Sequence, residues 1–74
     1  MQVAGRHPAT EQIARHFSFE HLRPPLRDVS QACAELAAAM VDQLPDGPEL
    51  TAGLRKLLEA KDCFVRARLD ADRS

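Results

Sequence analysis

The stretch "LPDGPE", residues 44–49, decides the fold expected for this chain of 74 residues. Pro45 cannot extend a helix that comes before it, and Asp46 or Gly47 can cap a helix end. Pro48 suits the first position of a new helix, where its missing N–H costs nothing. A connection this short makes the helices on its two sides antiparallel neighbours, so we expect an αα-hairpin in an all-α protein.

A helix is expected on each side of this turn, over residues 24–43 and residues 48–70. Before the turn, apolar residues recur at spacings of three and four, which only a helix places on one stripe. These residues are Leu26, Val29, Cys33, Leu36, Met40 and Leu44. The three alanines at 37–39 favour a helix and let a second helix approach closely.

The helix after the turn carries apolar residues on two adjacent stripes. One stripe is Leu50, Leu54, Leu57, Lys61 and Phe64, and the other is Leu54, Leu58, Val65 and Leu69. A single helical neighbour needs one stripe. Two stripes indicate two sets of neighbours, the first hairpin helix and a second subunit. The alternative is that a short N-terminal helix covers the second stripe, and both arrangements can coexist.

The N-terminal part has a different pattern. Residues 1–9 have no hydrophobic period and are expected to form a flexible arm ahead of a helical hairpin domain at 10–74. Thr10 is the expected cap of a short helix that turns Ile13 and Phe17 toward the core.

A chain this short buries only about 60% of its unfolded surface, so its fold needs a supplement. Cys33 and Cys63 are expected as two buried thiols without a disulfide, because their offset along the hairpin is about 7.5 Å. His7, His16 and His21 contain no pair four residues apart, so no metal or other cofactor is expected. Self-association into a homo-oligomer is therefore the expected supplement.

The charge and motifs exclude several functions. A net charge of -1 argues against coating a nucleic-acid polymer, which needs a strong positive field. No apolar run approaches 18 residues and no leader pattern is seen, so we expect no membrane partner and a cytoplasmic protein. No nucleophile has a base at recognisable spacing and no glycine-rich phosphate loop occurs, so no catalytic residue and no enzyme are expected.

Two groups of residues could bind a ligand. Lys61 falls inside an apolar stripe, where it either extends to the helix edge or, repeated around a symmetry axis, forms a pocket for a small polyanion. In "HFSFEHL", residues 16–22, Phe19 and His21 are either a hydrophobic lid or a stacking surface for a nucleobase. Arg15 and His16 could contribute to either arrangement.

Together these segments resemble a known family. The aromatic pair "FSF" followed by His21, then "ELAAAMVDQLP", then "DGPELTAGLRKLLEAKDCFVRARL" are similar to the hairpin domain of phage cyclic-nucleotide sponges, the small anti-CBASS and anti-Thoeris proteins. The similarity runs from about residue 16 to residue 69. It implies a homo-oligomer, commonly a hexamer, that sequesters cyclic di- or trinucleotide immune signals between subunits without cleaving them. A phage-encoded protein of this kind would act in the host cell cytoplasm.

The resemblance also implies roles for particular residues. Arg55, Lys61 and Arg66 would bind phosphates, and Phe19 and His21 would stack on bases. The chain has no tyrosine, so Phe19 would supply a ring without the polar contact of a hydroxyl.

The alternative function needs no nucleotide. In it the chain is a small oligomeric helical hairpin that binds a protein partner, as an inhibitor or an assembly adaptor. Its cations then only form ion pairs.

Overall fold

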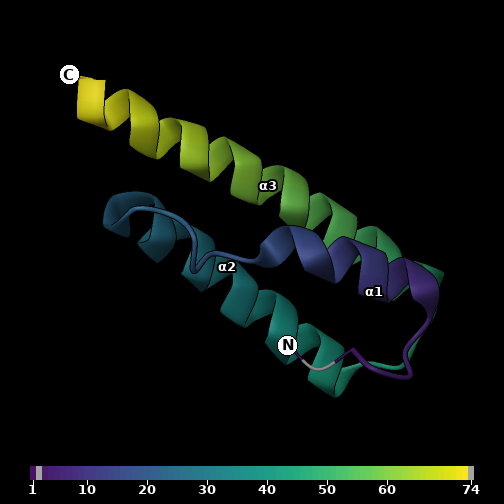
Figure 1. Cartoon of the computed structure of the whole chain (residues 1–74). Helices are drawn as coiled ribbons and strands as arrows, with labels where there is room; N and C mark the ends of the chain where they lie inside the picture. The colour runs from purple at the N-terminus through teal and green to yellow at the C-terminus, as the bar shows by residue number, and fades with distance from the viewer. Residues whose placement is uncertain (2, 74) are drawn as a thin grey trace.

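A computed structural model describes residue 1 and residues 3–73 of the chain. The described residues form helices and connecting segments, with no strand among them, so the all-α prediction is confirmed. In chain order the elements are α1 (Pro8–Ala14), the 3₁₀ turn η1 (Arg15–Phe17), α2 (Pro24–Gln43) and α3 (Pro48–Arg73). Figure 1 shows the two long helices, α2 and α3, running beside one another, with α1 packed on α3.

The ends of the long helices follow from the prolines. Pro24 and Pro25 occupy the first turn of α2, where the helix needs no backbone N–H. At its other end the N–H of Leu44 donates to the carbonyl oxygen of Met40 at 3.0 Å, which closes the last turn. Pro48 then opens α3. The observed bounds of α2 match the predicted ones, whereas α3 continues three residues beyond the predicted end.

The core lies between the α2–α3 pair and the N-terminal elements. Its buried apolar residues are Ile13, Phe17, Cys33, Ala37, Val41, Leu50 and Leu54. Phe17 is only 2% exposed, which fits its predicted role in the core. Because α1 packs against α3 and η1 packs against α2, the short N-terminal helix does cover an additional side of α3, as one of the two sequence-based alternatives proposed.

The buried face of α2 differs from the predicted stripe. Cys33, Ala37 and Val41 are buried, whereas Leu36 is 49% exposed and Leu44 is 44% exposed. Leu36 precedes Ala37 by one residue and therefore points about 100° away around the helix. The prediction gave weight to the large aliphatic residues, but α2 meets its neighbours through small ones, which allow a closer approach.

The two thiols also differ from one another. Cys33 is buried as predicted, and both cysteines are free, but Cys63 is exposed and the prediction for it was wrong. Cys63 follows the buried Leu54 by nine residues, which is two and a half helical turns, so it points away from the core.

Helix α1 begins earlier than expected. Pro8 occupies the first turn and His7 is the N-cap, whose side-chain Nδ1 accepts the N–H of Ala9 at 3.0 Å. Thr10, predicted as the cap, is instead fully buried within the first turn of the helix. The cap therefore lies three residues before the predicted one, because a proline suits the start of a helix better than its interior.

The segment before α1 is in contact with the turn between α2 and α3. Arg6 Nε donates to Asp46 Oδ1 at 2.7 Å. The terminal guanidinium nitrogens of Arg6 donate to the carbonyl oxygens of Val41 and Leu44, each at 2.8 Å. Part of the segment 1–9, predicted as a flexible arm, thus contributes hydrogen bonds to the end of α2.

Candidate functional site

Positively charged side chains gather at one groove between residues 15–22 and α3. Its volume is about 410 Å³, within the range of small-molecule sites. The cationic and imidazole side chains that line it are those of Arg15, His16, His21, Lys61 and Arg66. We refer to it as the cationic groove.

The end of η1 brings these residues together. Phe17 is buried in the core and holds the end of η1 against the long helices. The chain leaves η1 at Ser18 in an extended conformation, with φ of -68° and ψ of 146°. It then carries His21 along the groove wall, opposite the side of α3 that presents Lys61 and Arg66.

Lys61 is the best-defined cation of the groove. Its Nζ donates to the carbonyl oxygen of His16 at 2.7 Å and lies 6.0 Å from the centroid of the Phe17 ring. This distance is at the outer limit of a cation–π interaction. Lys61 therefore fastens the end of η1 to α3 and also places a positive charge at the groove.

The groove carries a charge of the opposite sign from that of the whole chain. Arg15, Lys61 and Arg66 contribute +3 and Asp62 contributes -1, which gives +2 with both imidazoles neutral. The complete chain carries -1. The fold thus concentrates cations at this groove, which favours an anionic ligand.

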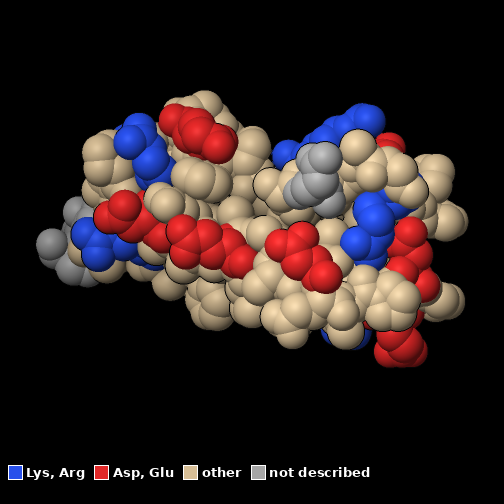
Figure 2. All heavy atoms as spheres, turned by 90° about the horizontal axis from the view of Figure 1, so that it is seen from below, with Lys and Arg blue, Asp and Glu red and all other residues tan. Residues whose placement is uncertain are grey.

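Part of the negative charge of the chain lies on the outer side of α2. Asp28, Glu35 and Asp42 are exposed and seven residues apart, so they share one side of the helix. Figure 2, a view from below Figure 1, shows acidic side chains in a row on this face. The acidic row therefore belongs to a different surface from the cationic groove.

Ser30 adds a polar group at the groove that the sequence did not reveal. Its side chain is fully buried, and its Oγ makes no hydrogen bond with the described residues. Leaving a buried hydroxyl unpaired costs about 1–3 kcal/mol, which a hydrogen bond to a water or a ligand would offset. The sequence indicates its burial through its spacing, because Ser30 lies three residues before Cys33 and seven before Ala37 and therefore on the same side of α2.

The predicted site residues are divided among three grooves. Lys61, Arg66 and His21 all line the cationic groove. Arg55 lines a separate groove of about 360 Å³ at the start of α3. Phe19 lines a third one, of about 480 Å³, between the N-terminal residues and α2. Arg15 and His16, noted in the sequence only as possible contributors, belong with the first three.

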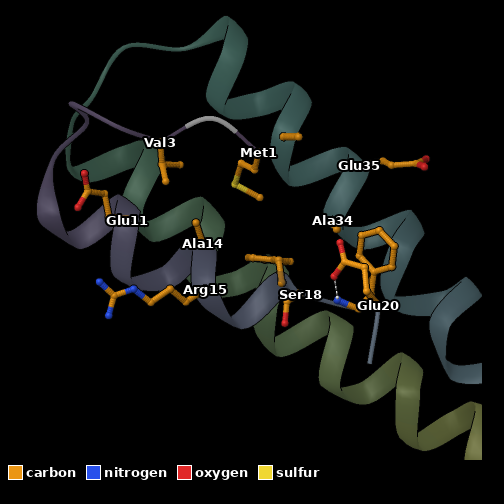
Figure 3. A pocket seen from close by; sticks show the side chains of 12 residues that line it. Met1, Val3, Glu11, Ala14, Arg15, Ser18, Glu20, Ala34 and Glu35 are labelled. Carbon is orange, nitrogen blue, oxygen red and sulfur yellow. Dashed lines mark hydrogen bonds between the residues drawn. The ribbon is translucent and has the colours of Figure 1, made fainter. Parts of the chain in front are cut away.

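The groove of Phe19, shown in Figure 3, has an acidic rim. Three of the residues that line it, Glu11, Glu20 and Glu35, are acidic, and one, Arg15, is basic. The hydrogen bond drawn there joins the N–H of Phe19 to Glu20 Oε2 at 3.2 Å. The backbone N–H groups of Glu20 itself and of Phe19 hold the pKa of the Glu20 carboxyl below its usual range. This rim suits a phosphate poorly.

The two grooves are nevertheless adjacent. Arg15 and Ser18 line both of them. A ligand with phosphates at Lys61 could therefore extend a base toward Phe19 across this shared edge.

The buried thiol of Cys33 is inert. Burial raises the pKa of the Cys33 thiol, and the nearby Lys61 cation offsets part of that rise. The thiol is therefore protonated near neutral pH and makes a poor nucleophile. Within residues 3–73, no group of three or more histidine, cysteine, aspartate or glutamate side chains could hold a metal ion, and none of the helices described could cross a membrane.

Neither a protein-family model, nor a curated protein, nor a solved structure matches this chain.

Proposed function

We propose that this chain is a non-enzymatic binding protein that sequesters a small phosphate-bearing ligand, and that the ligand is a cyclic di- or trinucleotide. The ligand class comes from the resemblance of residues 16–69 to phage anti-CBASS and anti-Thoeris sponges. In this proposal α2 and α3 form the helical hairpin of a homo-oligomer, commonly a hexamer, that acts in the host cytoplasm.

The observation that carries the proposal is the charge reversal at the cationic groove. A chain of net charge -1 places three permanent cations and two imidazoles around a volume of about 410 Å³. Arginine binds phosphate oxygens in a bidentate manner, and the lysine adds a point charge beside it. Imidazole rings at the rim can stack on bases.

The groove is open to solvent on one side. A ligand with two or three phosphates would leave part of its charge outside a single protomer. A second copy placed over this opening would repeat the same side chains around the matching repeat of the ligand. This supports a pocket completed between subunits.

The test is thermal unfolding of the full chain with a panel of cyclic di- and trinucleotides. A ligand at a hundredfold excess over its dissociation constant stabilises the folded state by about 2.7 kcal/mol. A linear dinucleotide and inorganic phosphate measure the contribution of charge alone. A broad panel with no member that raises the melting temperature contradicts the proposal.

Paired variants locate the site. Arg66→Gln removes a cation from the groove, and Lys56→Gln removes one from an exposed position of α3 outside it. Losing one charge-assisted contact costs about 1.5–3 kcal/mol, so Arg66→Gln should weaken binding at least about tenfold. Lys56→Gln should change the affinity by less than about twofold. Equal losses would place the ligand elsewhere on α3.

Sequestration and hydrolysis are separated by recovering the ligand. The complex is incubated, denatured, and its nucleotide analysed by chromatography. Intact ligand is the expected result, and a linear or monomeric product would make the chain an enzyme.

A second candidate function has its own supporting observation. Leu36, Leu44 and Phe64 are about half exposed, which is compatible with a surface for a protein partner. In that case no nucleotide of the panel should raise the melting temperature, and substitutions on the apolar surface should weaken binding of the protein partner.

A further inference from the structure

One side of the α2–α3 pair is apolar, and none of the other described elements packs on it. We call it the bare face and define it by five residues: Leu36, Met40, Leu44, Leu57 and Phe64. Leu36, Leu44 and Phe64 are 49%, 44% and 55% exposed, respectively. Leu36 and Leu44 line one groove together with Leu57, and Phe64 follows Leu57 by seven residues, or about two turns, on the same side of α3. Exposed leucines are ordinary when scattered singly, whereas apolar residues gathered on one side mark an interaction surface.

Helical geometry shows that α1 does not reach this face. Around α2, Ala34 and Ala38 lie on one side of the buried Ala37, and they line the groove beside the N-terminal residues. Leu36 and Met40 lie on the other side of Ala37, at about 100° per residue. The N-terminal elements thus cover one side of the pair, and the bare face is the opposite side.

The bare face is hollowed along its middle. A groove of about 270 Å³ runs between α2 and α3, and Glu49 is the charged residue among the described residues that line it. Gly53 forms part of this groove, and a Cβ atom placed there would meet nothing within 4 Å. The space above Gly53 therefore admits a side chain from outside the chain.

We infer that the bare face binds the bare face of a second copy, which gives a symmetric dimer with four long helices at its centre. An isologous contact needs a self-complementary surface, and an apolar face with a central hollow meets that need. Leu36 or Leu44 of each copy can enter the hollow above Gly53 of the other.

The available area supports this occupant. A standard interface removes about 800 Å² from each partner, which is about one sixth of the 4976 Å² exposed by this chain. Two helices about 10 Å apart and about 30 Å long present roughly 600 Å² in projection, before the relief of the side chains is added. This projection is about three quarters of the area that a standard interface takes from each partner, and the relief of the exposed side chains adds to it.

The net charge of the chain also permits two copies to associate. The chain carries a net charge of -1, so two copies repel one another weakly. Glu49 lies at the turn end of the pair. In an antiparallel arrangement of two copies their Glu49 side chains lie at opposite ends of the interface and do not meet.

The inference deepens the proposed function, since it names the surface for one of the contacts of the homo-oligomer, but it does not need the ligand. Lys61 lies one turn from Leu57 and Phe64 along α3, but its side chain extends away from the bare face to the carbonyl oxygen of His16. Arg66 lines the cationic groove beside it. Dimerisation through the bare face therefore leaves the cationic groove open.

The test is the mass of the full chain by light scattering across a concentration series. The expected wild-type mass is an even multiple of 8.2 kDa at tens of micromolar. Leu36→Glu places a carboxylate in the interface without a partner and should raise the dissociation constant at least about a hundredfold. Gln12→Glu adds the same charge on exposed α1 and should leave the mass unchanged.

The milder Leu36→Gln, checked by circular dichroism, keeps the test decisive if Leu36→Glu does not fold. A folded Leu36→Gln protein should dissociate at higher concentration than wild type. A wild-type mass of 8.2 kDa at all concentrations overturns the inference. So does an oligomer whose mass neither variant changes, or a monomer that uses this face for a different protein.

The proposed function can fail separately from this inference. Arg66→Gln should weaken nucleotide binding and leave the dimer intact, whereas Leu36→Glu acts on the dimer. A dimer that binds no member of the nucleotide panel would support the inference and contradict the proposed function.

Discussion

Both sides of the α2–α3 pair carry large apolar side chains, but one side is buried by other elements and the other side is exposed. On one side, Ile13 and Phe17 of the N-terminal elements complete a core in which Leu54 is 2% exposed. On the other side, Leu36 and Phe64 are about half exposed. What distinguishes them is what packs against each side: α1 and η1, ten residues of helix and turn, cover one side, and no other described element covers the other. Within the described residues, part of the apolar surface of the long helices is therefore left exposed.

The largest difference in stability between the two sides is expected when an aromatic ring is removed from each, and the larger loss is expected at Phe17. Phe17→Ala should cost about 3–5 kcal/mol, because the ring is 2% exposed and its loss leaves a cavity in a small core. Phe64→Ala, on the bare face, should cost the isolated protomer less than about 1 kcal/mol because the ring is already half exposed. Urea unfolding at low protein concentration measures both. Equal costs would show that Phe64 belongs to the core of the protomer.

The second largest loss of stability is expected at Arg6, which holds the N-terminal segment against the end of α2. Arg6→Ala removes two hydrogen bonds to carbonyl oxygens at the end of α2 and one to Asp46. We expect a loss of about 1–3 kcal/mol, since hydrogen bonds that involve a charged group are stronger than neutral ones. Arg15→Ala, a cation on η1, serves as the control and should change stability less. Unfolding followed by circular dichroism checks this, and an unchanged Arg6→Ala protein would mean that the segment does not hold α1.

Lys61 fastens the other end of the N-terminal elements. Lys61→Met keeps most of the aliphatic chain and loses the hydrogen bond to the carbonyl oxygen of His16. Because this contact is exposed, we expect a cost of about 1 kcal/mol. The same variant should weaken binding of an anionic ligand in the cationic groove, whereas Lys56→Met should alter neither property. A Lys61→Met protein of unchanged stability that still loses ligand would make Lys61 a ligand contact alone.

The sequence predicted the elements better than it predicted their faces. The prolines around residues 44–49 and at the start of α2 carry strong local signals, so both long helices were placed correctly. The buried side of α2 was not, because a pattern of large aliphatic residues suggested Leu36 and Met40. The core instead forms around Ala37, where a small side chain permits close packing. Small residues carry little hydrophobic signal, so only the packed structure reveals this preference.

The same limit applies to the candidate site. Lys61 and Arg66 could be chosen from their helix, and they do lie together with His21. Arg55, on the same helix, lies at a different groove because it precedes Arg66 by eleven residues, which is about 16 Å along the helix axis. The register of Ser30 with Cys33 and Ala37 indicates that it is buried, but its place at the groove depends on how the N-terminal elements pack against α2, which no local pattern encodes.

The smallest effect expected is a dependence of stability on pH at the turn. The hydrogen bond from Arg6 is the main cause that holds the pKa of the Asp46 carboxyl below its usual value of 3.8. A carboxyl with a lowered folded-state pKa stabilises the fold above its unfolded pKa, and this contribution disappears as the pH falls through the folded pKa. The difference in stability between wild type and Asp46→Asn should therefore be constant above about pH 5 and shrink below about pH 4.

Two further proteins, Glu20→Gln and the double variant Arg6→Ala/Asp46→Asn, show whether Arg6 causes the pH dependence at Asp46. The pKa of Glu20 is also lowered, by backbone N–H groups outside the turn, so Glu20→Gln removes a separate part of the acid dependence. In the Arg6→Ala background, however, Asp46→Asn should change the pH dependence very little, because the guanidinium that lowers the Asp46 pKa is gone. If Asp46→Asn has the same effect in both backgrounds, Arg6 is not the cause, and the contact that ties the N-terminal segment to the covered side must be weaker than its geometry indicates.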